Sequence, residues 1–215
     1  MKLLSIDSGR FTALFQITRI RGQLFLPDAA LMLASRYKFS SYPRSYEELS
    51  GEKVVFRHAQ FKDSAIESLE MYADGVVIST RSDTDIIDLF FRDLCEWLEN
   101  ELAISFVKTH SIDRIYDSTI VFQTEKNVLS PLRALSEIAD SIQLGLKDNC
   151  GLTVKYEPFG WVLSPDQTQN PALKPIAFRI ERRVGIEFAL QQFISGAPLK
   201  TKQHLALIEQ LESLV

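Results

Sequence analysis

The sequence predicts an α+β fold in which a mostly antiparallel sheet carries two long helices and a short C-terminal amphipathic helix. Two observations carry this prediction. Residues 65–81 alternate apolar and polar side chains on either side of Asp74-Gly75, as expected for a β-hairpin with one buried face. Residues 83–102 and 129–147 place apolar side chains three and four positions apart, which is typical of helices that pack on a core.

The hairpin prediction includes a loop and a register. Asp-Gly favours a two-residue type I′ loop, because both loop positions need a positive φ angle. A loop centred on Asp74-Gly75 places Met71 opposite Ile78 on the apolar face. A shift of one residue would turn Glu70 into the core, so the alternation specifies which face is buried.

The helix at 83–102 has a capping residue and a wide apolar stripe. Ser82 is the predicted cap, and Asp83 and Asp85 suit the positive N-terminal end of the helix dipole. Seven apolar side chains recur at helical spacing: Ile87, Phe90, Phe91, Leu94, Trp97, Leu98 and Leu102. We therefore expect this helix to fold back onto the apolar face of the hairpin.

The remaining elements follow from shorter patterns. Ser130 and Pro131 predict the start of the helix at 129–147, and Thr201 predicts the cap of the C-terminal helix. A short helix is predicted at 28–36, with Leu31 among its packed residues. The predicted strands are 11–17 with 23–26 as its partner, 54–61, 118–124, a hairpin within 152–163, and 176–183 with Ile176, Phe178 and Ile180 facing inward.

A chain of 215 residues is expected to form a single domain over residues 1–215. The order of strands and helices also allows two fused hairpin–helix halves, roughly 1–105 and 106–215, although no residue-level repeat supports that division. Residues 164–175 contain three prolines without apolar periodicity and are predicted to be a loop.

Composition and charge exclude several classes of protein. A net charge of −4 argues against nucleic acid or an anionic membrane as the main partner. Cys95 and Cys150 form no disulfide framework, and no apolar run reaches the ~18 residues of a spanning helix. The N-terminal residues carry too short an apolar run for a signal peptide. We expect a cytoplasmic protein with reduced thiols.

The common catalytic and cofactor motifs are missing. The sequence contains no phosphate-binding loop, no dinucleotide fingerprint, no nucleophile elbow and no Cys or His pair at metal-ligand spacing. Glu125-Lys126 lacks the spacer that a metal-dependent nuclease motif requires. No cofactor and no metal site is therefore predicted, and the sequence favours a non-catalytic protein over an enzyme.

Two segments have the composition of interaction surfaces. The segment 36–46 is rich in tyrosine and arginine, the residues that anchor protein interfaces, and its candidate contacts are Arg36, Tyr37, Tyr42, Arg44 and Tyr46. The strand at 176–183 carries a second group, formed by Arg179, Arg182 and Arg183. Arg182 shares the inward parity of the strand and so requires a buried partner.

We hypothesise a protein-interaction or assembly factor that forms a homo-oligomer or binds a protein partner. It would act through 36–46, 164–175 or the C-terminal helix. A first alternative is an enzyme or ligand-binding domain whose site is built from scattered residues, with Arg182, Glu181, His58 and His204 as the candidates. A second is weak nucleic-acid binding through the Arg179–Arg183 strand, against which the many nearby carboxylates argue.

Overall fold

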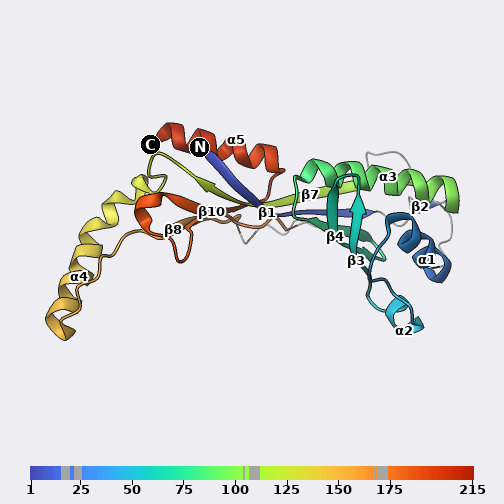
Figure 1. Cartoon of the computed structure of the whole chain (residues 1–215), viewed down its shortest axis with the longest axis horizontal. Coiled ribbons are helices and arrows are strands. Elements are labelled where there is room, and N and C mark those ends of the chain that lie inside the picture. The colour runs from blue at the N-terminus through green and yellow to red at the C-terminus, as the bar shows by residue number, and fades with distance from the viewer. Residues whose placement is uncertain (16–19, 22–25, 104, 107–111, 167, 169–173) are drawn as a thin grey trace.

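The computed structural model describes residues 1–15, 20–21, 26–103, 105–106, 112–166, 168 and 174–215. Within these residues, eight strands form one open antiparallel sheet in the order β3-β4-β5-β1-β7-β10-β9-β8, and β2 and β6 form a separate short pair (Figure 1). The strands are β1 Lys2–Phe15, β2 Ile20–Arg21, β3 Lys53–Phe61, β4 Ser64–Tyr72, β5 Gly75–Thr80, β6 Ser105–Phe106, β7 Ile112–Gln123, β8 Gly160–Leu163, β9 Phe178–Arg182 and β10 Gln192–Ala197.

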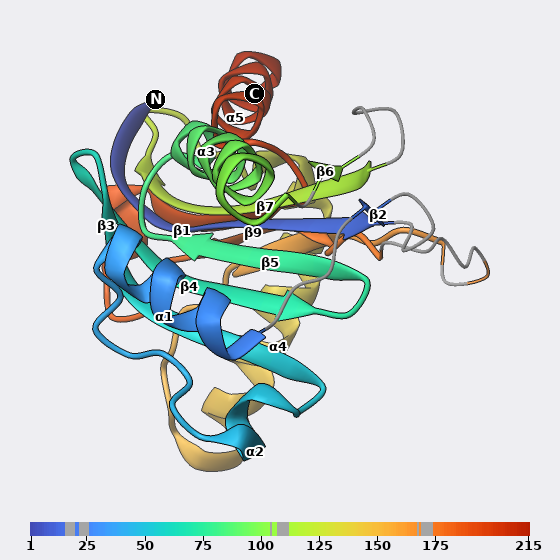
Figure 2. The same cartoon turned by 90° about the vertical axis from the view of Figure 1, so that its right-hand side faces the viewer.

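Helices accompany this sheet as the α+β prediction requires, and the predicted fold class is confirmed. Two of them, α3 and α5, lie along the same face of the sheet (Figures 1 and 2). The helices are α1 Leu26–Tyr37, α2 Tyr46–Leu49, α3 Thr84–Leu102, α4 Ser136–Cys150 and α5 Thr201–Leu214, with 3₁₀ turns η2 Ser130–Leu135 and η3 Phe188–Leu190.

The order of elements repeats once along the chain. The first half runs β1, α1, β3, β4, β5, α3, and the second runs β7, α4, β8, β9, β10, α5. The sheet order is correspondingly palindromic, with β1 and β7 paired at its centre and β3 and β8 at its two edges. The chain thus has an approximate internal two-fold arrangement, which the sequence hinted at only through the order of its predicted elements.

Each half has its own hydrophobic cluster on this sheet. The first cluster lies between α3, α1 and the strands β3, β4 and β5, and the second lies between α5 and the strands β7, β9 and β10. Strand β1 joins the two, because Phe11 belongs to the first cluster while Ile6 packs against the second.

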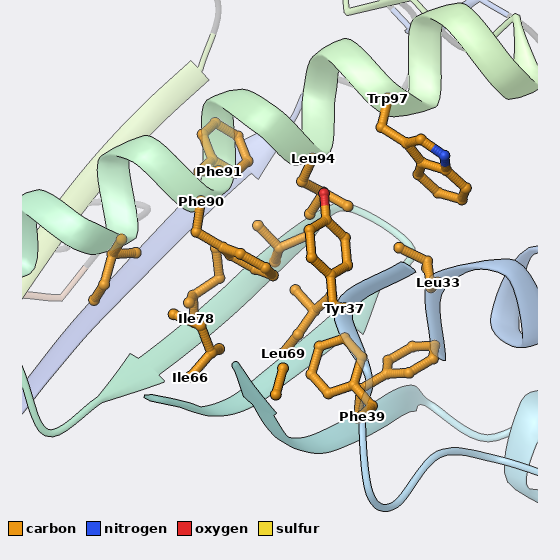
Figure 3. Packing of buried hydrophobic residues seen from close by; sticks show 14 of the residues in the cluster. Leu33, Tyr37, Phe39, Ile66, Leu69, Ile78, Phe90, Phe91, Leu94 and Trp97 are labelled. Atoms are coloured by element: carbon orange, nitrogen blue, oxygen red, sulfur yellow. The ribbon is translucent and has the colours of Figure 1, made fainter. Parts of the chain in front are cut away.

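The first cluster is built largely by α3, as its sequence pattern predicts (Figure 3). Six of the seven stripe residues are buried, and Leu102 is half-buried. Fully burying a side chain as large as Phe90 stabilises the fold by about 1.5–3 kcal/mol. The helix cap differs from the prediction: Asp83 caps the helix by accepting a hydrogen bond from the Asp85 N–H, in place of Ser82.

The β4–β5 hairpin forms, but its predicted register is wrong by two residues. Met71 faces Val76, and Gly75 pairs with Tyr72 as part of the strand. Gly75 belongs to β5 because it also pairs with β1. A Cβ at this position would lie 2.4 Å from the Ala13 carbonyl oxygen, so the close approach of β1 requires a glycine. The apolar face is unchanged by a shift of two. The opposite face of β5 is also partly covered, since Val77 is buried.

The N-terminal third departs from the sequence predictions in three ways. Strand β1 starts at Lys2 and pairs with β5 and β7. Its predicted partner at 23–26 falls mostly outside the described residues, and Leu26 begins α1. Leu31, predicted to pack, is exposed, because α1 buries Ala29, Ala30, Leu33, Ala34 and Tyr37 instead.

The second half also contains corrections. Residues 130–135 form the 3₁₀ turn η2 before α4 begins at Ser136, and Ser130 makes no cap. In the predicted hairpin at 152–163, only β8 is a strand. Strand β9 starts at Phe178, which leaves Ile176 exposed outside it, and β10 was not predicted. Lys200, not Thr201, is the N-cap of α5.

Candidate interaction surface

The candidate residues of the sequence lie in two separate groups near opposite edges of the sheet. The group at 36–46 runs from the last residues of α1 to the first residue of α2 and lies beside β3, and the Arg179–Arg183 group lies on β9 and the residue after it. The two groups therefore do not form one surface. Whether either contacts a partner stays a prediction.

Part of the first group serves the fold. Tyr37 is buried, and its hydroxyl donates a hydrogen bond to Asp93 at 2.7 Å. The Arg36 guanidinium contacts both oxygens of the same carboxylate, at 2.9 and 3.0 Å. Burial and the Asp93 carboxylate raise the pKa of Tyr37 well above its ordinary value. This network fixes α1 to α3 and keeps Tyr37 inside the protein, while the Arg36 side chain remains partly exposed.

The other members of this group face outward to different degrees. Tyr42 is half-buried against the first cluster, and the Arg44 guanidinium lies over its ring at 4.8 Å from the centroid. Tyr46 is 82% exposed at the start of α2, whose capping box is formed by Ser45 and Glu48. Tyr46 is thus the one aromatic side chain of this group that is open to solvent.

Arg182 is buried, as its inward parity on β9 predicts, and its guanidinium binds three partners. Nε donates to the Pro158 carbonyl oxygen at 3.2 Å, Nη1 to the Phe188 carbonyl oxygen at 3.0 Å and Nη2 to Glu157 at 3.2 Å. The guanidinium also lies 4.3 Å from the centroid of the Phe188 ring. Desolvation lowers the pKa of Arg182, and Glu157 opposes that shift.

This arrangement bears on the nucleic-acid hypothesis. The Arg182 side chain is buried and bonded inside the protein. Arg179 is exposed at a position of β9 with the opposite parity, and Arg183 is exposed just after the end of the strand. The three side chains therefore do not form a continuous phosphate-binding patch.

The residues proposed for a scattered catalytic site do not meet. His58 is exposed on the edge strand β3, whereas His204 is buried in α5 beside the other half of the sheet. Glu181 and Arg182 are neighbours on β9 and point to opposite faces. His110 lies outside the described residues. In the described part of the chain, no three His, Cys, Asp or Glu side chains gather as metal ligands.

His204 has a purely internal hydrogen-bond network. Ser195 Oγ donates to the Arg179 carbonyl oxygen at 2.7 Å and so accepts from His204 Nε2 at 2.8 Å. Nδ1 is then the acceptor for the Ser118 hydroxyl, also at 2.8 Å. All three side chains are fully buried, so no substrate reaches either serine. Burial lowers the pKa of His204 to about 4, which keeps the imidazole neutral.

The surface that sequence reasoning missed is the arm, which we define as Leu135 at the end of η2, helix α4 and residues 151–159. Helix α4 has no buried residue and extends away from the sheet (Figure 1). Gly151 ends it in the left-handed region, at a φ of 71°, and the chain then runs back to β8. The exposed apolar side chains of this region are Leu135, Ile138, Ile142, Leu144, Leu152, Val154, Tyr156 and Phe159.

The sequence contains a signal for the helix of the arm, but this signal does not show where the helix lies. The pattern at 129–147 predicts an amphipathic helix, and we expected its stripe to cover the sheet. Only the residues just before η2, Val128 and Leu129, are buried in the second cluster. An amphipathic pattern shows that a helix needs an apolar partner, but not where that partner lies.

A second uncovered apolar surface, which we call the groove, lies between α5, the edge strand β8 and its neighbour β9. Its volume is about 250 Å³. Two of its lining residues, Trp161 and Phe178, have their ring centroids 5.3 Å apart. The groove is lined by Trp161, Leu163, Phe178, Leu207, Gln210, Leu211 and Leu214.

In comparisons with known proteins, no protein-family model and no curated protein matches the chain. In the described residues, no helix has both the length and the apolar character to cross a membrane. The fold defines an α+β protein with an internally repeated antiparallel sheet, and the arm and the groove are its distinguishing surfaces.

Proposed function

We propose that this protein is a non-catalytic assembly factor that associates with copies of itself through the arm. One observation carries the proposal: α4 is an amphipathic helix of 15 residues without a buried side chain. An isolated helix of this length is only marginally stable in water. Packing of its apolar stripe against another surface supplies the missing stabilisation.

The size of the arm's apolar surface supports a stable interface. Full burial of a Leu-sized side chain is worth up to about 3 kcal/mol, or about 120 Å² at about 25 cal/mol per Å². With about half of each of its eight exposed apolar side chains uncovered, the region offers roughly 500 Å² of apolar surface. A stable interface buries about 800 Å² per partner, of which somewhat more than half is apolar.

Charge favours a protein partner for α4 over a lipid surface. The helix carries three acidic side chains, Glu137, Asp140 and Asp148, against the single basic Lys147. Helices that lie on anionic membranes carry lysine and arginine on their polar face. Helix α4 instead carries more acidic than basic side chains.

The test compares two substitutions with equal starting exposure. Ile138 on α4 and Leu31 on α1 are both 58% exposed, so glutamate at either position is tolerated by the single chain. Sedimentation velocity and light scattering over a concentration series would show an oligomer for the unmodified protein and for Leu31→Glu. Ile138→Glu removes about 1 kcal/mol of apolar burial per copy, so a dimer is expected to dissociate at about 30-fold higher concentration.

Two results would contradict the proposal. The first is that the unmodified protein stays monomeric up to the highest accessible concentration. The other is an oligomer that Ile138→Glu leaves as stable as Leu31→Glu does. Circular dichroism and thermal unfolding of both variants check that the fold itself is retained.

A further inference from the structure

The internal repeat gives α1 and α4 the same place in the two halves. Each helix follows a central strand, β1 or β7, and precedes an edge strand, β3 or β8. Each half then closes with a helix, α3 or α5, on the same face of the sheet. The surroundings of α1 therefore indicate where a helix in the position of α4 should pack.

In the first half, α1 is seated in the core. Tyr37 contacts α3 through Phe90, with ring centroids 4.8 Å apart, and β3 through Phe61, at 6.3 Å. Leu33 is also buried in this cluster (Figure 3). The seat of α1 thus consists of α3 and the edge strand β3, which Tyr37 contacts, and of the next strand β4, whose Ile66 and Leu69 belong to the same cluster.

In the second half, the corresponding three elements are α5, β8 and β9, and they line the groove. Leu207, Leu211 and Leu214 come from α5, Trp161 and Leu163 from β8, and Phe178 from β9. The groove is open: Leu163 and Leu214 remain 62% and 75% exposed. The helix and its seat are both present in the second half, and they are apart.

Both connections of α4 are anchored to the body of the second half. On one side of the helix, Val128 and Leu129 are buried in the second cluster. On the other, Arg182 binds Glu157 and the Pro158 carbonyl oxygen. Between these two anchors the arm extends outward (Figure 1).

We infer that the groove is the seat for α4 of a second copy, and that two chains exchange these helices reciprocally. Exchange of an identical element forms a dimer at low energetic cost, because each chain already carries both the helix and the surface that receives it. The apolar stripe of α4 and the apolar lining of the groove would then cover each other. This inference rests on the proposed self-association and specifies which surface receives the arm.

The test uses cysteines on exposed positions in a Cys150→Ser background. One chain carries Ile142→Cys on α4, and the other carries Leu163→Cys or Leu214→Cys in the groove. After the two singly substituted proteins are mixed and exchanged, a short bismaleimide cross-linker is added. At about 10 µM protein, docking raises the local thiol concentration to about 1 mM, so cross-linking should be roughly 100-fold faster than for a Leu31→Cys control mixed with the same groove variants.

Other outcomes overturn the inference, and they separate it from the proposed function. If Ile142→Cys cross-links only to itself, α4 pairs with α4, and self-association stands without the groove. If a chain carrying both cysteines cross-links internally while the mixed proteins do not, α4 occupies its own groove. If sedimentation shows only monomers, the proposed function and the inference fail together.

Discussion

Thr84 and Thr201 cap each other across 117 residues of sequence. The Thr84 N–H donates to the Thr201 hydroxyl oxygen at 3.1 Å, and the Thr201 N–H donates to the Thr84 hydroxyl oxygen at 2.9 Å. Each threonine is the first residue of its helix, α3 or α5, and both are fully buried. The reciprocal bonds satisfy one unpaired N–H at each helix start and join the two halves of the repeat.

Ion pairs around this junction offset its unfavourable charges. Two helix N-termini face each other here, and lysines beside the start of α5 add further positive charge. Asp88 and Asp85 of α3 bind Lys200 and Lys202, respectively. The Tyr116 hydroxyl also donates to Asp88.

We expect Thr84→Val and Thr201→Val each to lower the free energy of unfolding by about 1–3 kcal/mol. Each substitution leaves one buried N–H without an acceptor while preserving side-chain shape. Urea unfolding followed by circular dichroism would measure the change. Thr12→Val is the control, because it makes the same change of side chain on β1, outside the junction. Equal effects at Thr12 and at the junction would contradict the capping role.

Protonation of His204 is expected to destabilise the fold in acid. Its pKa is lowered to about 4 in the folded protein, whereas an unfolded histidine titrates near 6.5. Between these values the unfolded chain binds more protons, so stability is highest above pH 6.5 and falls as the pH drops toward 4. The loss from this one residue is about 3 kcal/mol.

The measurement for His204 is the free energy of unfolding at several pH values between 4 and 7. His204→Gln lacks the titrating ring, so the difference in stability between the unmodified protein and this variant should shrink as the pH falls. Carboxylates titrate in both proteins and cancel in that comparison. A difference independent of pH would show that His204 is not the acid-sensitive group.

Arg182 should anchor the base of the arm. Arg182→Met removes all three hydrogen bonds of the buried guanidinium, to the Pro158 and Phe188 carbonyl oxygens and to Glu157, which we expect to destabilise the fold by about 2–4 kcal/mol. Release of this segment would speed tryptic cleavage after the exposed Lys155. Arg183→Met, at the exposed neighbouring position, serves as the control. Unchanged cleavage at Lys155 in Arg182→Met would rule out the anchoring role.

The two cysteines should differ sharply in reactivity. Burial in α3 raises the pKa of the Cys95 thiol to about 12, so almost no thiolate is present at neutral pH. Cys150 is exposed at the end of α4. Iodoacetamide at pH 7.5 should therefore modify Cys150 alone, as intact mass and peptide mapping would show. Rapid modification of Cys95 in the folded protein would contradict the burial of this side of α3.

The sequence predicts best where local chemistry and burial agree. In α3, the apolar stripe and the acidic start lead to the right helix with the right buried face. The apolar face of the β4–β5 hairpin is likewise correct, because alternation survives a shift of two residues. The predicted loop position is wrong, because Gly75 lies within β5 in close contact with β1.

The candidate surface was less predictable for a related reason. The aromatic-basic composition of 36–46 does not show that Asp93, far along the chain, binds Arg36 and Tyr37. The pattern of α4 does not show that its stripe stays uncovered. Both facts depend on which distant elements fold next to these segments.

By itself, the sequence determined the α+β class, most of the strands and the three main amphipathic helices, because side-chain periodicity is set by neighbours a few residues apart. Tertiary structure alone decided the palindromic sheet, the mutual capping of Thr84 and Thr201, and the buried network of His204. It also decided that α1 is seated while α4 is not. These features join residues as far apart in the sequence as Lys2 and Gln123, or Thr84 and Thr201. No local pattern encodes a contact between such distant segments, since the contact depends on which surfaces remain uncovered after the sheet has formed.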